Sequence, residues 1–293
     1  MFDIKDILEP ETLEEALELL NQNSQLKIIA GGTDVLIRLH HRNIKDIELL
    51  SIRKIKGLDE IKMLEDGSIE IGAMATFAQI FRSDIIEKNI KVLGEGAVSM
   101  GGPQVRNMAT IGGNVCNGAV SADSAPALFA LNAKLKLRSK DNERIVPIQE
   151  FYLGPGRVDI KSDEILLSLI IEKQNYENTR GHYIKFSNRK AMDIAMVSVA
   201  VVSSIENNKF KDLRIALGVS APTPIRCSEA ETYAKGIEIT DENINKIAEL
   251  AVGSSKSRNS WRASKDFREH LIKELTKRGI KKTIEIEGGE DNE

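Results

Sequence analysis

Two glycine-containing motifs are the parts of the sequence best suited to chemistry. The first, Gly31–Asp34 (GGTD), follows the apolar run at residues 26–30 and precedes a helix-like segment. Glycine permits positive φ angles and lets main-chain N–H groups approach a ligand closely, and a helix N-terminus attracts anions. The motif therefore suits a phosphate. Taken alone, a plain turn is the better interpretation, since GGTD is neither GxGxxG nor a P-loop.

The second motif, Ala109–Asn114 (ATIGGN), again combines small residues with a hydroxyl and an amide. Asp123 follows it, directly ahead of an apolar segment of helical pattern. A dinucleotide carries two phosphates and a polyol or ribose. Two glycine loops on one pyrophosphate, with a carboxylate for a hydroxyl, would therefore form a workable site. Two unrelated turns, with Asp123 as a helix cap, explain the spacing equally well.

Other reactive side chains are weaker candidates. Cys116 and Cys227 have no CxxC partner, so the chain has no pattern for an iron–sulfur cluster or structural zinc of its own. Adjacent residues on a helix do not face each other, which makes His40 and His41 a poor metal pair. Arg106 either contacts a phosphate or fixes its loop, and we favour the structural role. We expect neither a metal site nor a catalytic side chain.

Composition excludes several classes of function. The 293 residues include 41 basic and 44 acidic side chains, so the net charge of −3 gives no case for binding nucleic acid or a membrane surface. No apolar run approaches the roughly 20 residues that span a bilayer. The N-terminus lacks the basic and apolar regions of a signal peptide. With only two isolated cysteines, we expect a reducing, cytoplasmic setting.

Hydrophobic periodicity predicts mixed helices and strands in the first part of the chain. Thr12 is the predicted N-cap of the first helix, with Glu15 completing a capping-box pattern, and Asp66-Gly67 is a predicted hairpin turn. The predicted helices lie at residues 11–20, directly after Gly32, and at 77–86, 91–99 and 126–131, and the other predicted strands at residues 26–30, 133–138 and 165–171. A glycine-rich stretch spans residues 101–118.

A second domain is predicted after residues 172–181 (EKQNYENTRG), a polar and turn-rich stretch typical of a linker. Two strands are expected around Asn207-Asn208, and helices at residues 241–252 and 262–278. Strands followed by helices indicate an α+β domain. The final residues, EGGEDNE, are acidic, and we expect them to be disordered.

Six ordered segments between Ala30 and Ile272 together resemble one known family. They read AGGTDVLIRLHHRN, GPQVRNMATIGGNVCNGAVSADSA, GPGRVDIKSDEIL, KFSNRKAMDIA, LGVSAPTPIRC and SWRASKDFREHLI. In these segments the chain resembles the FAD-binding (medium) subunits of the molybdenum hydroxylase family. Within that family, the segments resemble those of the bacterial xanthine dehydrogenases.

The resemblance implies an α+β fold in two domains. A two-subdomain FAD-binding fold of the vanillyl-alcohol oxidase type would be followed by an α+β flavoprotein C-terminal domain. The implied limits are 1–176 for the FAD-binding domain, with subdomains at about 1–57 and 58–176, then 181–285 for the C-terminal domain and 286–293 for an acidic tail.

The resemblance also implies an oxidoreductase subunit of a heterotrimer. A large partner subunit would carry the molybdenum cofactor and hydroxylate a purine, and a small one would carry two [2Fe–2S] clusters. This chain would pass electrons from those clusters through FAD to NAD⁺. Three alternatives stay open: the flavin subunit of a related enzyme such as nicotinate dehydrogenase, a self-sufficient FAD oxidoreductase, and a non-catalytic flavin-binding scaffold. For the self-sufficient enzyme, Asp193 and Glu229 are the acid–base candidates.

The family's cofactor contacts carry over to matching positions. Its first loop, which wraps the FAD pyrophosphate with main-chain amides, matches Lys27, Ile28, Ile29, Ala30, Gly31, Gly32, Thr33 and Asp34. Its second loop, on the same diphosphate, matches Ala109, Thr110, Ile111, Gly112, Gly113 and Asn114. The remaining matches are Gly101 where the chain passes the cofactor, Asp123 at its polar middle portion, and Ile165 or Leu166 and Ile184 near adenine or flavin.

Lys185 matches a basic contact close to the isoalloxazine, where a positive charge would stabilise the reduced, anionic flavin. A solvated lysine on an edge strand is an equal alternative. Covalently flavinylated relatives carry a histidine near the first glycine pair, and Gly31–Thr33 has none, so we expect noncovalent FAD. The chain also lacks the cysteine-bearing insert of relatives that reduce hydroxybenzoyl-CoA and the AGGHS loop of CO dehydrogenases, which disfavours both reactions.

Overall fold

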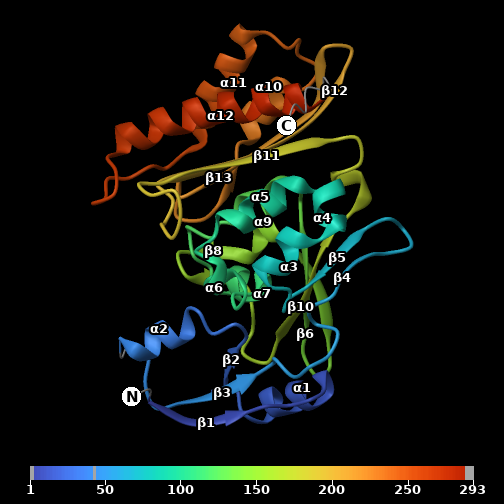
Figure 1. Ribbon diagram of the computed structural model, residues 1–293, viewed down its shortest axis with the longest axis vertical. Coiled ribbons are helices and arrows are strands. Elements are labelled where there is room, and N and C mark those ends of the chain that lie inside the picture. Colours follow the sequence, from blue (N-terminus) through green and yellow to red (C-terminus); the bar gives the residue numbers. More distant parts are fainter. Residues whose placement is uncertain (1–2, 42–43, 288–293) are drawn as a thin grey trace.

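The computed structural model describes residues 3–41 and 44–287. Figure 1 shows three parts stacked along the longest axis: a small sheet near the N-terminus, a larger sheet covered by short helices, and a C-terminal sheet beneath three helices. No helix within the described ranges is both long and apolar enough to cross a membrane. Of the predicted acidic tail, residues 288–293 lie outside these ranges.

The first part is a three-stranded parallel sheet of order β1-β3-β2. Its elements are β1 (Ile4–Leu8), α1 (Leu13–Gln22), β2 (Lys27–Ile29), α2 (Val35–His40) and β3 (Ile47–Ser51). Thr12 caps α1 as predicted, and its hydroxyl accepts a hydrogen bond from the Glu15 N–H at 3.2 Å. The Glu15 carboxylate accepts from the N–H of Glu11 rather than Thr12, so the predicted capping box is only half formed.

The middle part is a five-stranded antiparallel sheet of order β4-β5-β10-β6-β7. Its strands are β4 (Ile61–Met63), β5 (Ile69–Gly72), β6 (Lys134–Arg138), β7 (Glu143–Pro147) and β10 (Ile165–Ile171). The predicted hairpin is confirmed, with the Asp66 carboxylate accepting from the Ser68 N–H at 2.8 Å and Gly67 at a φ of 80°. β10 is the central strand, and its burial on both faces explains its nearly continuous apolar sequence.

Short helices and a small hairpin complete the middle part. They are α3 (Phe77–Arg82), α4 (Asp84–Asn89), α5 (Lys91–Ser99), α6 (Pro103–Arg106), α7 (Ile111–Cys116), α8 (Ala125–Ala130), α9 (Ile148–Phe151), β8 (Tyr152–Gly154) and β9 (Arg157–Val158). The predicted helix at 77–86 is divided in two, because the chain is extended at Ser83, which caps α4. The glycine-rich stretch 101–118 holds the two short helices α6 and α7.

The C-terminal part is an antiparallel sheet of order β11-β12-β13-β14 with three helices. Its elements are β11 (Arg180–Phe186), β12 (Val197–Glu206), β13 (Lys209–Gly218), β14 (Ile225–Arg226), α10 (Ser228–Ala234), α11 (Asp241–Ser254) and α12 (Lys265–Glu287). The predicted turn is confirmed, with Asn207 and Asn208 both at positive φ, as a tight hairpin requires.

Two predicted limits in this part were wrong. Helix α12 begins later than residue 262, because the Ser264 hydroxyl caps it by accepting from the Phe267 N–H at 3.2 Å. It also continues beyond residue 278, since Gly279 sits where the helix packs on the side chain of Val201 and does not end it. The linker at 172–181 is ordered, with a 3₁₀ helix η1 (Lys173–Asn175) and the first two residues of β11.

The C-terminal sheet is buried on both faces. Along β12, Ala200 and Val202 join the core of the middle part, whereas Val199 and Val201 join the core under the C-terminal helices. Successive side chains of a strand point to opposite faces, so one continuous apolar strand serves two cores. The sheet thus joins the C-terminal helices to the middle part (Figure 1).

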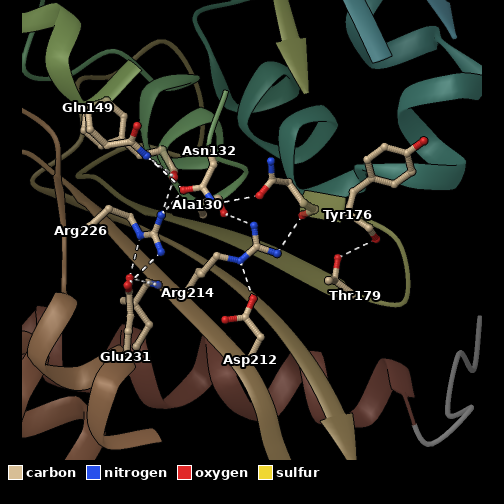
Figure 2. Close-up of polar contacts among 12 residues, drawn as sticks. Ala130, Asn132, Gln149, Tyr176, Thr179, Asp212, Arg214, Arg226 and Glu231 are labelled. Atoms are coloured by element: carbon tan, nitrogen blue, oxygen red, sulfur yellow. Dashed lines mark hydrogen bonds and ion pairs between the residues drawn. The ribbon is translucent and has the colours of Figure 1, made fainter. Parts of the chain in front are cut away.

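A buried polar network fastens this sheet to the end of α8 (Figure 2). The Arg214 guanidinium donates to the carbonyls of Ala130 and Asn175, each at 2.8 Å. Arg226 donates to the Phe129 carbonyl at 3.0 Å and holds the Glu231 carboxylate through two nitrogens. Cations at a helix C-terminus satisfy carbonyls that lack intrahelical partners. The network therefore sets the position of α8 relative to the sheet.

Candidate functional site

The first glycine motif leaves the C-terminal end of β2 and leads into α2. Gly32 adopts a φ of 76°, and its carbonyl accepts from the Leu36 N–H at 3.0 Å, which opens the helix. Within the described ranges, no acceptor is found for the main-chain N–H groups of Gly31, Gly32, Thr33 and Asp34. Four consecutive free donors ahead of a helix form an anion-binding loop.

The second glycine motif is built differently from the first. Thr110 caps α7, and its hydroxyl accepts from the Gly113 N–H at 3.2 Å. The N–H groups of Ile111 and Gly112 donate to the carbonyls of Ala75 and Ala73 at 2.9 and 2.8 Å. These amides are already satisfied within the protein. The second motif therefore presents side chains and a closely packed backbone to a ligand, while the first motif presents amides.

The two motifs touch through their backbones. A Cβ atom on Gly31 would lie only 1.9 Å from the Met108 carbonyl oxygen and 3.0 Å from the Ala109 Cα, whereas one on Gly112 would lie 2.6 Å from the carbonyl oxygen of Ala73, in the segment after β5. Glycine is required at both positions because no side chain fits there. The structure therefore brings together two motifs that are almost eighty residues apart in the sequence.

A cavity of about 780 Å³ lies between the first sheet and the start of α7. Most of the predicted contacts line it: Lys27, Ile28, Ala30, Gly31, Gly32, Thr33, Asp34, Ala109, Thr110, Gly112, Gly113, Asn114, Ile165 and Leu166. Such a volume falls within the range of ligand and cofactor sites. The glycine motifs thus share one cavity and are not unrelated turns.

Several lining residues were missed in the sequence analysis. Arg38 on α2 donates to the Asn117 side chain at 3.0 Å and ties the two motifs together. Lys161 and Glu164 line the cavity from the segment before β10. The Glu164 carboxylate accepts hydrogen bonds from two nitrogens of Arg144, at 2.7 and 2.8 Å. It therefore stabilises the cavity wall and is not available to bind a ligand. Arg38 could have been predicted from the sequence, because it is a basic residue about one helical turn after a phosphate-binding loop. Lys161 and Glu164 could not, because their place at the cavity depends on tertiary structure.

Six predicted contacts do not line the cavity: Ile29, Gly101, Ile111, Asp123, Ile184 and Lys185. Ile111 is fully buried in the core of the middle part. Ile184 packs on the core beneath the C-terminal helices, because its side chain alternates with that of Lys185 along β11. The prediction of a side-chain contact from Ile184 to the cofactor therefore has no support in the structure.

Lys185 and Asp123 form a buried ion pair. The Lys185 Nζ lies 2.8 Å from the Asp123 Oδ2, and these side chains are 9% and 8% exposed. Lys185 also donates to the Ser99 carbonyl at 3.1 Å, and the Tyr183 hydroxyl donates to Asp123 at 3.2 Å. Burial raises the pKa of Asp123, and the charge of Lys185 opposes that shift. Lys185 does lie on the edge strand β11, but the interpretation as a solvated lysine is wrong.

The pair connects to the second motif through Ser124. The hydroxyl of this residue donates to the Asn114 Oδ1 at 2.7 Å. The amide nitrogen of Asn114 has no partner within the described ranges, so it is left as a donor at the cavity wall. Asp123 and Lys185 do not line the cavity themselves but thereby help to fix the position of Asn114, which does.

The remaining candidates have structural roles. Arg106 donates to the carbonyls of Met100 and Gly101, at 3.0 and 3.4 Å, which agrees with the favoured role of fixing its loop. Burial raises the pKa of the Cys116 thiol to about 12, so this cavity-lining residue is a poor nucleophile. No group of three or more potential metal ligands occurs in the part of the chain that the structure describes.

These features fit a cofactor that contains a diphosphate. The free amides of Gly31–Asp34 provide donors for phosphate oxygens, and the absence of a side chain at Gly31 lets the backbones of the two motifs approach closely beside the same cavity. Apolar side chains from Ile28, Ile165 and Leu166 line the cavity beyond the motifs, as an aromatic ring system would require.

Comparisons with known proteins place the chain in a family. Residues 2–173 match the FAD binding domain in molybdopterin dehydrogenase, and residues 182–283 match the CO dehydrogenase flavoprotein C-terminal domain. The chain is 42% identical over 289 residues to a xanthine dehydrogenase FAD-binding subunit of Escherichia coli O157:H7, covering 99% of each chain. It is 34% identical over 203 residues to the nicotinate dehydrogenase FAD-subunit of Eubacterium barkeri, covering 68% of each.

A solved structure shows the same fold. Carbon monoxide dehydrogenase from Hydrogenophaga pseudoflava contains a chain that superposes with a TM-score of 0.91 at 26% sequence identity, covering 97% of this chain and 98% of that one. The predicted fold class, a two-subdomain FAD-binding fold with an α+β flavoprotein domain, is confirmed. The chain therefore belongs to the FAD-binding subunits of the molybdenum hydroxylase family, which are parts of oxidoreductases.

Proposed function

We propose that the chain is the electron-transferring subunit of a xanthine dehydrogenase-like enzyme. It receives electrons from the [2Fe–2S] clusters of a small partner subunit and passes them through FAD to NAD⁺. A purine is hydroxylated at the molybdenum cofactor of a large partner subunit. The observation that carries this proposal is the 42% identity to a xanthine dehydrogenase FAD-binding subunit over 99% of both chains. The proposed setting is the cytoplasm.

Bound FAD supplies the redox chemistry, and the chain holds it in place. The N–H groups of Gly31–Asp34 would hold the diphosphate, and the Asn114 amide would donate to it from the second motif. Lys27 and Arg38, which both line the cavity, add positive charge on that side. FAD is held noncovalently, since Gly31–Thr33 lacks histidine and the Cys116 thiol stays protonated near neutral pH.

Lys185 and Asp123 act as positioning residues in this proposal. They lie outside the cavity lining, and the hydrogen bond from Ser124 to Asn114 transmits their position to the second motif. The family resemblance assigns Lys185 a place close to the isoalloxazine. In the structure its charge is largely balanced by the carboxylate at 2.8 Å.

The alternatives receive less support. A self-sufficient oxidoreductase needs an acid or base over the flavin, and neither Asp193 nor Glu229 lines the cavity. The Asp193 carboxylate instead accepts from the N–H groups of Arg189 and Ile194, at 3.0 and 2.9 Å. The similarity to a nicotinate dehydrogenase subunit is lower and covers about two thirds of the chain. The hydroxylated substrate is set by another subunit.

Two experiments test the proposal in order. The first is an absorbance spectrum of the purified chain, repeated on the supernatant after acid precipitation. Flavin bands that move wholly into the supernatant indicate noncovalent FAD. A colourless chain that takes up no added FAD contradicts the cofactor assignment for this chain alone.

The second experiment uses the chain co-expressed with its large and small partner subunits. The complex should reduce NAD⁺ with xanthine as the electron donor, and the FAD-loaded chain alone should not. Reduction of NAD⁺ with nicotinate but not xanthine would favour the alternative enzyme. Turnover of any donor by the isolated chain would favour the self-sufficient oxidoreductase.

A further inference from the structure

A cluster of arginines without acidic partners lies at the start of α12, apart from the cavity described above. It contains Arg258 and Arg262, from the segment between α11 and α12, and Arg268, from the first turn of α12. Within the described ranges, none of these three side chains forms an ion pair with a carboxylate. The partners of Arg268 are the Met196 carbonyl and the Ser260 hydroxyl, both of which are neutral.

Two buried nitrogens in this cluster lack a hydrogen-bond acceptor. They are the Nε atoms of Arg262 and Arg268. Arg268 is only 4% exposed, and burial together with the charges of Arg258 and Arg262 lowers its pKa. Buried donors are almost always satisfied, and buried charges are almost always paired. The unmet donors and the uncompensated charge both favour an anion as the ligand of this cluster.

The nearby acidic residues do not fill this role. Glu269 on α12 pairs with Lys265 at 3.7 Å, and no ion pair links Asp266 to the three arginines. The cluster also lies at the N-terminal end of α12, a helix of 23 residues, where the helix dipole adds partial positive charge. Positive side chains at this end are unfavourable unless an anion binds.

An aromatic ring adjoins the arginines. Trp261 is 82% exposed, and the Arg262 guanidinium lies over its ring, 4.1 Å from the centroid. Arg262 covers one face of the indole and leaves the other to solvent. An open aromatic face can stack on a nucleobase, and guanidinium groups bind phosphates through paired hydrogen bonds. A base and a phosphate in one ligand match this combination.

We propose that Trp261, Arg258, Arg262 and Arg268 form a binding site for the ADP moiety of an adenine nucleotide. The adenine stacks on the open face of Trp261, and the phosphates bind between Arg258 and the guanidinium groups of Arg262 and Arg268. The ligand is either the ADP half of a dinucleotide acceptor or a free adenine nucleotide. The site itself stands independently of the proposed electron transfer, since none of these residues lines the FAD cavity.

The test uses the full-length, FAD-loaded chain and ADP as the probe. Trp261 is the only tryptophan in the sequence, so its fluorescence reports directly on the site. ADP should change this fluorescence saturably, and calorimetry should give the same dissociation constant. Adenosine, which lacks phosphate, should bind at least tenfold more weakly. An ADP titration that shows neither a fluorescence change nor heat would overturn the proposal.

Variants separate the site from general effects on folding. Arg258 is exposed and unpaired in the part of the chain described, so Arg258→Ala should leave FAD content and the melting temperature unchanged while weakening ADP binding about tenfold to a hundredfold. Arg258→Lys should retain part of the affinity. Arg278→Ala is the matched control, because Arg278 lies on the same helix, is 68% exposed and pairs with Glu274. Equal ADP affinity in both alanine variants would refute the site.

Two further arms distinguish the sources of the nucleotide. If the site holds the ADP half of the acceptor, NAD⁺ should compete with ADP, and in the complex Arg258→Ala should raise the KM for NAD⁺ without changing kcat. If it holds a free nucleotide, ADP should bind equally well at saturating NAD⁺. A third result, no ADP binding but loss of the partner subunits in Arg258→Ala, would assign the cluster to a protein interface and overturn the nucleotide proposal.

Discussion

The contact between the two glycine motifs can be tested by adding a single methyl group. In Gly31→Ala, the new Cβ would lie 1.9 Å from the Met108 carbonyl oxygen and 2.7 Å from the Met108 carbonyl carbon. Ordinary van der Waals contact begins at 3.4 Å, so the two backbones would have to separate by about 1.5 Å. Both neighbours are main-chain atoms, and no side-chain rotation can relieve the clash.

Two losses follow from this separation. Overpacking of this kind costs about 1–3 kcal/mol, which corresponds to a decrease in melting temperature of roughly 2–12 °C for a chain of this size. The displaced Gly31–Asp34 amides would also lose their alignment with the diphosphate. Hydrogen bonds to charged groups contribute about 1.5–3 kcal/mol each, so the loss of two should weaken FAD binding at least a hundredfold.

The assay measures FAD content after purification, the dissociation constant for FAD and the melting temperature without added FAD. Gly253→Ala is the control, because Gly253 lies within α11 and a Cβ there would meet no atom within 4 Å. That variant should keep its flavin, and its free energy of unfolding should rise by about 0.5–1 kcal/mol, since alanine is more favourable than glycine within a helix. A Gly31→Ala chain with full flavin and unchanged melting temperature would refute the backbone contact and the cavity built on it.

Three other predictions concern titratable groups. Because its pKa is raised to about 12, Cys116 should react with a maleimide at least a hundredfold more slowly than free cysteine at neutral pH in the native chain; rapid labelling would contradict the raised pKa. Lys185→Met should destabilise the chain by about 3–5 kcal/mol in urea unfolding, because it leaves Asp123 buried without a cation, and adding Asp123→Asn should recover part of that loss. Burial raises the pKa of Glu164, but hydrogen bonds from Arg144 outweigh this effect and leave it below 4.5, so the ion pair stabilises the fold at neutral pH and this stability is lost as the pH falls through the lowered value. The difference in unfolding free energy between wild type and Glu164→Gln should therefore shrink under acid conditions, and a constant difference would contradict the assignment.

Local patterns in the sequence were sufficient for much of the secondary structure. The cap at Thr12, the hairpin at Asp66-Gly67 and the turn at Asn207-Asn208 depend on a few neighbouring residues, and all three were confirmed. Helix limits were less accurate where a tertiary contact replaced the local signal. Gly279 illustrates this, since a glycine that would usually end a helix instead packs α12 against the sheet.

The family and its cofactor motifs were likewise evident from the order of short segments in the sequence. What those motifs do was decided by contacts between distant residues. The amides at Gly31–Asp34 are free, whereas those of Ile111 and Gly112 are satisfied by carbonyls of the segment after β5. Similar Gly-Gly sequences therefore have different roles, because a hydrogen-bond partner from elsewhere in the chain is invisible in the motif itself.

The sequence by itself determined the types of those elements that have a clear local pattern, the family and the positions of the two glycine motifs, because these depend on residue type and local spacing. Only the tertiary structure decided which groups face the cavity. It paired Lys185 with Asp123, turned Ile184 toward the other core and added Arg38 to the site. Side-chain orientation depends on how strands and helices pack, and residues tens of positions apart supply those contacts.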